Sequence, residues 1–181
     1  MLSIYQLKPA FQSLLRPLVR SCAKFGITAN GVTLAAMLVS LALGVVLFFI
    51  GERRALFLLL PLWMFLRMAF NAIDGMLARE FQQQSKLGAF YNELCDIISD
   101  TALYLCLIAF SAVQNELLLL AAFLAILAEY AGVMAPLVGQ ERRYDGPMGK
   151  SDRAFWFSLI CIILLAQHWL AFSAQLLFYL C

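Results

Sequence analysis

Six polar side chains in the middle of the sequence are of the types that bind a hard divalent cation. They are Asn71, Asp74, Asn92, Glu93, Asp96 and Asp100. They lie within two long apolar stretches, residues 55–78 and 87–112, each of which is long enough to cross a bilayer. Ionised groups at membrane depth are costly and usually mark a transport pathway or a binding site. These residues therefore predict a polar site inside the membrane.

The helical spacing of these residues places them on one face of each stretch. Successive residues of an α-helix are rotated by about 100°, which puts four residues of the first stretch within a sector of about 60°. These four are Arg67, Asn71, Asp74 and Ala78. On the second stretch Asn92, Glu93, Asp96 and Asp100 occupy about 100°.

The short connection between the two stretches, residues 79–86, predicts that they are antiparallel neighbours with facing polar sides. Carboxylate and amide oxygens are the ligands that Mg²⁺ prefers, so this pattern predicts a metal site. Pairing of the polar groups with one another, or a water-filled cavity, is the alternative. That alternative would suffice for a single acid, but four acids and two amides on two facing helices favour the metal site.

The same residues resemble the signature of the CDP-alcohol phosphatidyltransferases. That signature reads D-x-x-D-G-x-x-A-R, eight residues, then G-x-x-x-D-x-x-x-D. The sequence contains Asn71-x-x-Asp74-Gly75-x-x-Ala78-Arg79, eight residues, and Gly88-x-x-x-Asn92-x-x-x-Asp96. Every spacing matches, but amides replace two of the four signature acids. The chain therefore resembles a divergent bacterial inner-membrane branch of the family.

The resemblance implies a reaction and a set of site residues. The implied reaction moves a phosphatidyl group from CDP-diacylglycerol to an alcohol and releases CMP, as a step of phospholipid biosynthesis. The implied cofactor is Mg²⁺ or Mn²⁺, held by Asn71, Asp74, Asn92 and Asp96, with Asp100 and Glu93 as further candidate ligands. Asp96 matches the last signature acid, which is the proposed general base. The implied donor-binding residues are Asn30, Thr33, Gly75, Ala78, Arg79 and Gly88.

Replacement of two signature acids leaves an alternative open. A family member that retained the fold and lost turnover would bind a nucleotide lipid, a cation or a partner protein without catalysis. Retention of Asp74 and Asp96 favours an enzyme, whereas Asn71 and Asn92 favour the non-catalytic alternative.

The longest polar segment, residues 139–153, contains residues suited to an anion. Gly149, Lys150 and Ser151 at the start of a helix offer backbone N–H groups, an ammonium and a hydroxyl. Ordinary positive charge on the cytoplasmic side explains these residues equally well. Family members that use phosphorylated acceptors have a similar Gly-Lys pair here. The resemblance therefore assigns Lys150, Ser151 and Arg153 to the acceptor and favours a phosphorylated or otherwise anionic one.

The composition predicts an all-α integral membrane protein. Of 181 residues, 64% are hydrophobic and only 13% are charged. Six spans of about 20 residues would use most of this length. We therefore expect residues 1–181 to form a single domain of the resembled family, with a six-transmembrane-helix bundle over residues 31–181. An interfacial turn is expected at residues 167–169, followed by a last helix, 170–181, that is too short to span the membrane.

Residues 2–25 predict an amphipathic helix that lies in the membrane interface. Apolar residues recur every three to four positions and basic residues lie between them, which is typical of interfacial helices. Thr28 or Asn30 is expected to cap the first span that follows. Within the second apolar stretch, Arg67 would be costly as an isolated charge, so we expect it to pair with an acid such as Asp74 or Glu129.

The distribution of Lys and Arg predicts the orientation. Of 13 such residues, four precede the first span, two lie between the second and third spans, and four lie in residues 139–153. By the positive-inside rule these segments face the cytoplasm. The prediction is a multi-pass protein of the bacterial inner membrane, with its active site facing the cytoplasm. Its expected partners are the lipid bilayer, CDP-diacylglycerol and an alcohol acceptor. The resemblance also implies a homodimer, and no nucleic acid is expected to bind.

Overall fold

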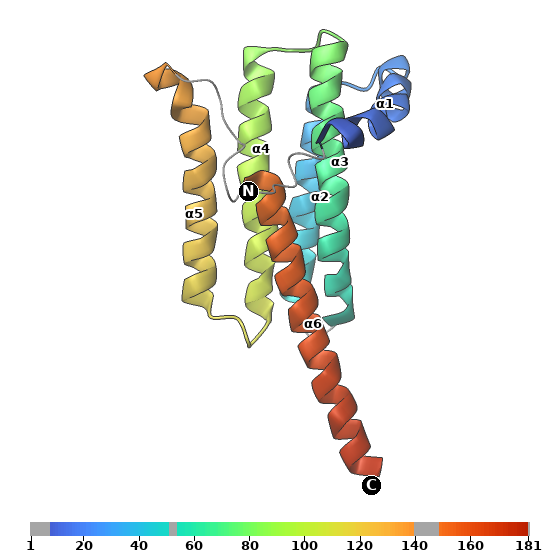
Figure 1. The fold of residues 1–181 in the computed structure, drawn as a ribbon, viewed down its shortest axis with the longest axis vertical. Coiled ribbons are helices and arrows are strands. Elements are labelled where there is room, and N and C mark those ends of the chain that lie inside the picture. The colour runs from blue at the N-terminus through green and yellow to red at the C-terminus, as the bar shows by residue number, and fades with distance from the viewer. Residues whose placement is uncertain (1–7, 51–53, 140–148, 181) are drawn as a thin grey trace.

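The computed structural model describes residues 8–50, 54–139 and 149–180, which form an elongated bundle of helices (Figure 1). The α-helices are α1 (Lys8–Lys24), α2 (Ala29–Phe49), α3 (Leu59–Glu80), α4 (Lys86–Leu105), α5 (Asn115–Met134) and α6 (Lys150–Leu180). The short 3₁₀ helices are η2 (Arg54–Leu58), η3 (Cys106–Ala109) and η4 (Ala135–Val138). These described ranges contain no strand, which confirms the all-α prediction.

Within the described residues, three segments are long and apolar enough to cross a membrane: Ala29–Phe49, Ala55–Glu80 and Asn115–Met134. They correspond to α2, to η2 with α3, and to α5. Helix α4 is of similar length and lies beside them, but it carries Glu93, Asp96 and Asp100. The bundle is therefore that of a membrane protein, although the predicted set of six spans is not confirmed.

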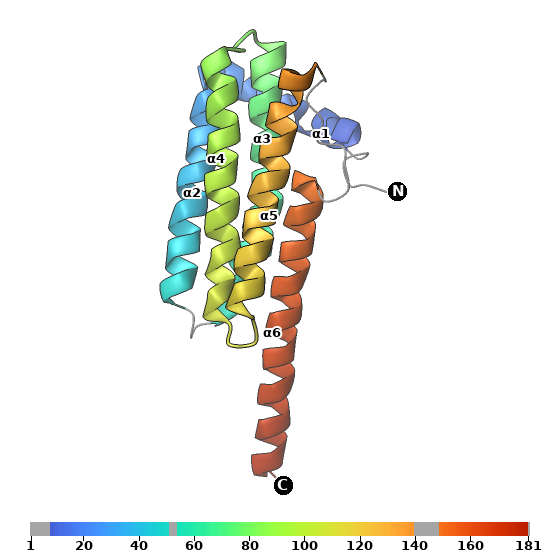
Figure 2. The ribbon, with the colours of Figure 1, turned by 90° about the vertical axis from the view of Figure 1, so that its left-hand side faces the viewer.

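The predicted turn at residues 167–169 was wrong. Helix α6 continues from Lys150 to Leu180 without interruption, so the segments expected before and after this turn are one helix. The physical reason is that residues 150–180 contain neither Gly nor Pro, the residues that most strongly disfavour a helix. Its 31 residues extend about 46 Å, and its C-terminal half projects beyond the other helices (Figure 2).

Helix α1 confirms the predicted N-terminal helix, of which residues 2–7 lie outside the described ranges. It lies across the bundle near the end at which α3 and α4 are joined (Figure 1). One side contacts α3, with Val19 fully buried, while Leu14 and Leu18 are exposed. An exposed pair, Arg16 Nη2 to Glu80 Oε1 at 3.0 Å, also connects α1 to the end of α3.

The starts of α2 and α4 lie next to each other, and each is capped by a side chain. Thr28 Oγ1 accepts a hydrogen bond from the N–H of Gly31 at 3.1 Å, so Thr28 rather than Asn30 caps α2. Ser85 Oγ caps α4 by accepting from the N–H of Gly88 at 2.9 Å. Gln83 Oε1 accepts from the N–H of Ala29 at 2.7 Å and thereby joins the two regions.

Helices α2 and α4 pack closely because Gly44 lacks a side chain. A Cβ at Gly44 would lie 2.7 Å from the carbonyl oxygen of Ala102 on α4. An apolar cluster around Phe57, Leu103 and Cys161 joins η2, α4 and α6. A second apolar cluster around Val19 and Leu77 joins α1 to α3. The buried charged residues are held in α3, α4, α5 and the start of α6.

Candidate active site

The carboxylate of Asp96 is the centre of the buried polar site. Its Oδ1 accepts from Arg67 Nη2 at 2.9 Å and from Asn71 Nδ2 at 3.3 Å. Its Oδ2 accepts from Asn92 Nδ2 at 3.5 Å and from the ammonium of Lys150. A carboxylate offers about four lone-pair sites, so these four donors use all of them. Helices α3, α4 and α6 thus converge on one side chain that is only 4% exposed.

The partners of Arg67 differ from those predicted. Its guanidinium bonds to Asp96 and to Asp100, and it also donates to the main-chain oxygen of Asp96 at 3.1 Å. Pairing of Arg67 with acids is therefore confirmed, but the two acids named as examples, Asp74 and Glu129, were wrong. Asp96 and Asp100 are one helical turn apart on α4, and the planar fork of an arginine can bridge two such acids.

Asp74 instead faces α2. Thr33 Oγ1 lies 2.7 Å from Asp74 Oδ2 and 3.1 Å from the carbonyl oxygen of Ala29. Both Thr33 and Asp74 are buried. The structure therefore places one predicted donor-binding residue in direct contact with one predicted metal ligand.

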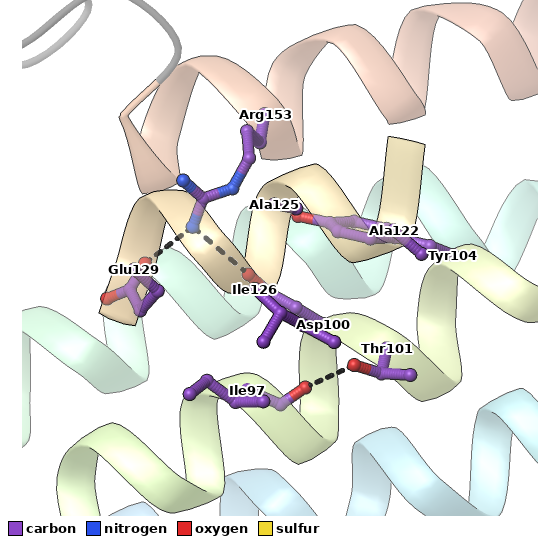
Figure 3. Close-up of a pocket in the computed structure, with 9 residues that line it drawn as sticks. All are labelled: Ile97, Asp100, Thr101, Tyr104, Ala122, Ala125, Ile126, Glu129 and Arg153. Carbon is purple, nitrogen blue, oxygen red and sulfur yellow. Dashed lines mark hydrogen bonds and ion pairs between the residues drawn. The ribbon is translucent and has the colours of Figure 1, made fainter. Parts of the chain in front are cut away.

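Glu129 pairs with α6 rather than with Arg67. Its Oε2 accepts from Arg153 Nη2 at 2.5 Å, and its Oε1 lies 3.5 Å from Lys150 Nζ. Arg153 Nη2 also lies 3.7 Å from Asp100 Oδ2, so it is held between α4 and α5 (Figure 3). Lys150 and Arg153 are three residues apart and therefore share a face of α6, from which both contact acids.

A small cavity lies beside the Glu129–Arg153 ion pair. It is lined by residues of α4, α5 and α6, including Asp100, Tyr104 and Arg153 (Figure 3). Its volume is about 10 Å³, which is close to the space of one water molecule. It is therefore too small to be the site of a nucleotide or lipid.

The predicted donor-binding residues gather near the start of α2 and the joined ends of α3 and α4. A Cβ at Gly88 would lie 2.8 Å from Asn30 Oδ1, and one at Gly75 would lie 3.2 Å from Arg79 Nη1. The Arg79 side chain thus folds back over Gly75, and Asn30 lies beside Gly88. Ala78 is half-buried on the same part of α3.

The predicted acceptor-binding residues lie in the first turn of α6. Lys150 has a side chain that is 25% exposed, whereas that of Arg153 is only 6% exposed. Ser151 is half-buried between them in the chain. The sequence indicated these residues but not their contacts with Asp96, Asp100 and Glu129.

The site contains oxygen donors of the kinds that a divalent cation prefers. The amide groups of Asn71 and Asn92 turn their N–H atoms toward Asp96, because an amide oxygen there would be repelled by the carboxylate. The two amide oxygens therefore remain suitable ligands, together with Asp74. Asp96 and Asp100 contact Arg67, Lys150 and Arg153, so a metal ion would compete with these cations for the carboxylate oxygens. Within the described ranges, no three His, Cys, Asp or Glu side chains are grouped as metal ligands.

Comparison with known proteins gives a family and three relatives. A model of the CDP-alcohol phosphatidyltransferase family matches residues 26–180. The chain is 49% identical over 158 residues to inner membrane protein YnbA of Escherichia coli K12, covering 87% of this chain and 78% of that protein. It is 29% identical over 126 residues to an uncharacterized protein of Aquifex aeolicus, covering 69% and 62%.

A third relative carries an enzyme name. The chain is 33% identical over 101 residues to phosphatidylinositol phosphate synthase of Mycobacterium marinum, covering 54% of this chain and 40% of that protein. No solved structure matches the chain significantly.

Proposed function

The chain belongs to the CDP-alcohol phosphatidyltransferase family, and from this membership we propose that it transfers a phosphatidyl group from CDP-diacylglycerol to an alcohol and releases CMP. The observation that carries the proposal is the convergence of signature residues from α3 and α4 with Lys150 of α6 on the Asp96 carboxylate. The phosphatidylinositol phosphate synthase among the relatives supports a role in phospholipid biosynthesis.

The proposed reaction is a substitution at phosphorus. The acceptor oxygen forms a bond to the phosphorus that carries diacylglycerol, the bond from that phosphorus to CMP breaks, and CMP leaves with the electron pair. The acceptor proton passes to Asp96. Because four donors fill the Asp96 oxygens, one of them must move before a proton can bind. Lys150, with a side chain 25% exposed against 5% for Arg67, is the partner best able to move.

The proposed metal is one Mg²⁺ or Mn²⁺ ion. Asp74 and the amide oxygens of Asn71 and Asn92 would hold it. When bound, such an ion would supply positive charge that stabilises the phosphoryl oxygens. Divalent-metal dependence is general in the family, so the proposal for this chain concerns the ligands and the number of ions.

We assign the donor to the region where α2, α3 and α4 begin or end. In this region the Arg79 side chain covers Gly75 and Asn30 lies beside Gly88, and the exposed Arg79 can contact a phosphate. The membrane-length helices and the inner-membrane relative indicate a membrane protein. We further propose that the site faces the cytoplasm of a bacterium and that the protein forms a homodimer.

The test is CMP release by the purified protein in mixed micelles that contain CDP-diacylglycerol and Mg²⁺ or Mn²⁺. A panel of neutral and phosphorylated alcohols would be supplied one at a time. We expect release that depends on an acceptor and is fastest with a phosphorylated one. Absence of release with every alcohol, combined with measurable binding of the nucleotide lipid, would favour a non-catalytic binding protein.

That second function has support from one specific observation. The two asparagines that replace signature acids, Asn71 and Asn92, lie next to Asp96 and donate hydrogen bonds to it. The hydrogen-bonding capacity of the Asp96 carboxylate is therefore satisfied without a ligand. Turnover therefore has to be measured rather than assumed from the family.

Lys150→Ala should weaken the acceptor interaction. Lys150 is the most exposed of the three cations that contact the buried acids, and a hydrogen bond to a charged group is worth about ten-fold in binding or more. We expect the acceptor KM to rise about ten-fold and the KM for CDP-diacylglycerol to change little. Arg16→Ala, which removes an exposed cation on α1, is the control. Loss of nucleotide binding in Lys150→Ala would show that Lys150 serves the donor instead.

A further inference from the structure

We propose that the ammonium of Lys150 takes the place of a second divalent cation at Asp96, so that this chain binds one metal ion where a site with four signature acids would bind two. This inference deepens the proposed function and concerns its metal site. It is tested by metal binding alone, without turnover.

The position of Lys150 supports the substitution. Its ammonium contacts Asp96 Oδ2 and lies 3.5 Å from Glu129 Oε1, so it bridges an acid of α4 and an acid of α5. In a carboxylate site, a metal ion bridges carboxylates from different helices in the same way. On the other side of Asp96, Oδ1 is bonded to Arg67.

The two replaced acids explain why a lysine suffices. Aspartates at positions 71 and 92 would add two negative charges beside Asp96, and these could approach one another only around a strongly charged cation. Asparagines reverse the polarity, because the N–H groups of Asn71 and Asn92 donate to the Asp96 carboxylate. The amides, Arg67 and Lys150 together satisfy both oxygens of Asp96.

The charges next to Asp96 oppose the binding of a second ion there. Aspartates at positions 71 and 92 would each add a negative charge beside Asp96, whereas the asparagines add none and donate hydrogen bonds to it. A second ion at Asp96 in this chain would be repelled by the adjacent ammonium and guanidinium.

The experiment is a titration of metal-free, full-length protein in detergent with Mn²⁺, in which free Mn²⁺ is measured by electron paramagnetic resonance. The variants are Lys150→Met, which removes the charge at similar length, and Lys150→Arg, which keeps it. Arg16→Met controls for the loss of a positive charge elsewhere on the protein. We expect Lys150→Met to bind one Mn²⁺ ion more than the parent. Tighter binding of one ion without a second would overturn the proposal, because the loss of any nearby positive charge produces it.

The controls should match the parent in both stoichiometry and affinity. Unchanged Mn²⁺ binding by Lys150→Met would overturn the proposal, and so would two equally tight ions in the parent. An increase in Lys150→Arg as large as that in Lys150→Met would also overturn it, because the positive charge would then be irrelevant.

Asn92→Asp keeps the proposal testable if Lys150→Met does not fold. The added acid makes the site more negative beside Asp96, so a second ion should compete better with Lys150. We expect this variant to bind an additional ion or the existing one more tightly, and unchanged binding would contradict the charge argument. Absence of CMP release together with the expected Mn²⁺ results would reject the proposed reaction and leave this inference standing.

Discussion

Asp96→Asn should abolish detectable CMP release while leaving the protein folded. Asp96 is the acid on which the donors from α3, α4 and α6 converge, and the asparagine amide cannot take the acceptor proton. General-base assistance is typically worth about 10²–10⁴ in rate, and the loss of charge also disturbs Lys150. The expected reduction is therefore at least about 10².

The fold should survive this change because neither buried cation depends on Asp96 alone. Arg67 keeps its bond to Asp100, and Lys150 keeps its contact with Glu129. The measurements are the rate of CMP release, the elution of the protein as a single species, and binding of CDP-diacylglycerol in the presence of Mn²⁺. We expect only the rate to be lost.

Asp100→Asn is the matched control, since it makes the same chemical change one turn along α4. Asp100 contacts Arg67 and Arg153 but receives no bond from Lys150 or from the two amides. This variant should lose less activity than Asp96→Asn. Near-normal turnover of Asp96→Asn would show that another residue is the general base, with Asp100 or Glu93 as the next candidates.

The parts of the site that the sequence predicted are those within one helix. A rotation of about 100° per residue is enough to place Asn71 and Asp74 on one face of α3, and Asn92 and Asp96 on one face of α4. The short connection then brings these faces together, and the hydrogen bond from Asn71 of α3 to Asp96 of α4 shows that they meet. The resemblance of the chain to its family rested on the same spacing, and the family model confirms it.

The parts that the sequence did not predict depend on how distant helices pack. The pairing of Glu129 with Arg153 is fixed by the relative position of α5 and α6, which are joined through residues outside the described ranges. Periodicity within each helix does not contain this information. The continuous α6 was missed for a different reason, because a polar Gln167-His168 pair inside an apolar run was interpreted as a turn, although no helix-breaking residue is present.

The wrong partners predicted for Arg67 show the same limit. Asp74 lies on the same face of α3 two turns away, so the spacing along one helix favoured that pair. In the structure the guanidinium points to α4, where two acids one turn apart accept both of its ends. Asp74 meets Thr33 of α2 instead.

Arg67→Leu should lower the yield of folded protein more than it changes any Michaelis constant. Arg67 is 4% exposed and bonds to Asp96, Asp100 and the main-chain oxygen of Asp96. Removing one partner of a buried ion pair typically costs about 3–5 kcal/mol, because the remaining charge stays buried without compensation. Here two acids would lose their shared cation.

The measurement is the amount of monodisperse protein recovered in detergent and its midpoint of thermal unfolding. Arg16→Leu is the control, since exposed ion pairs are worth about 0–1 kcal/mol, and it should unfold close to the parent. Arg67→Lys should be intermediate, because a lysine keeps the charge but lacks the planar fork that reaches both Asp96 and Asp100. Normal yield of Arg67→Leu with a selective loss of substrate affinity would show that Arg67 contacts substrate rather than holding α3 against α4.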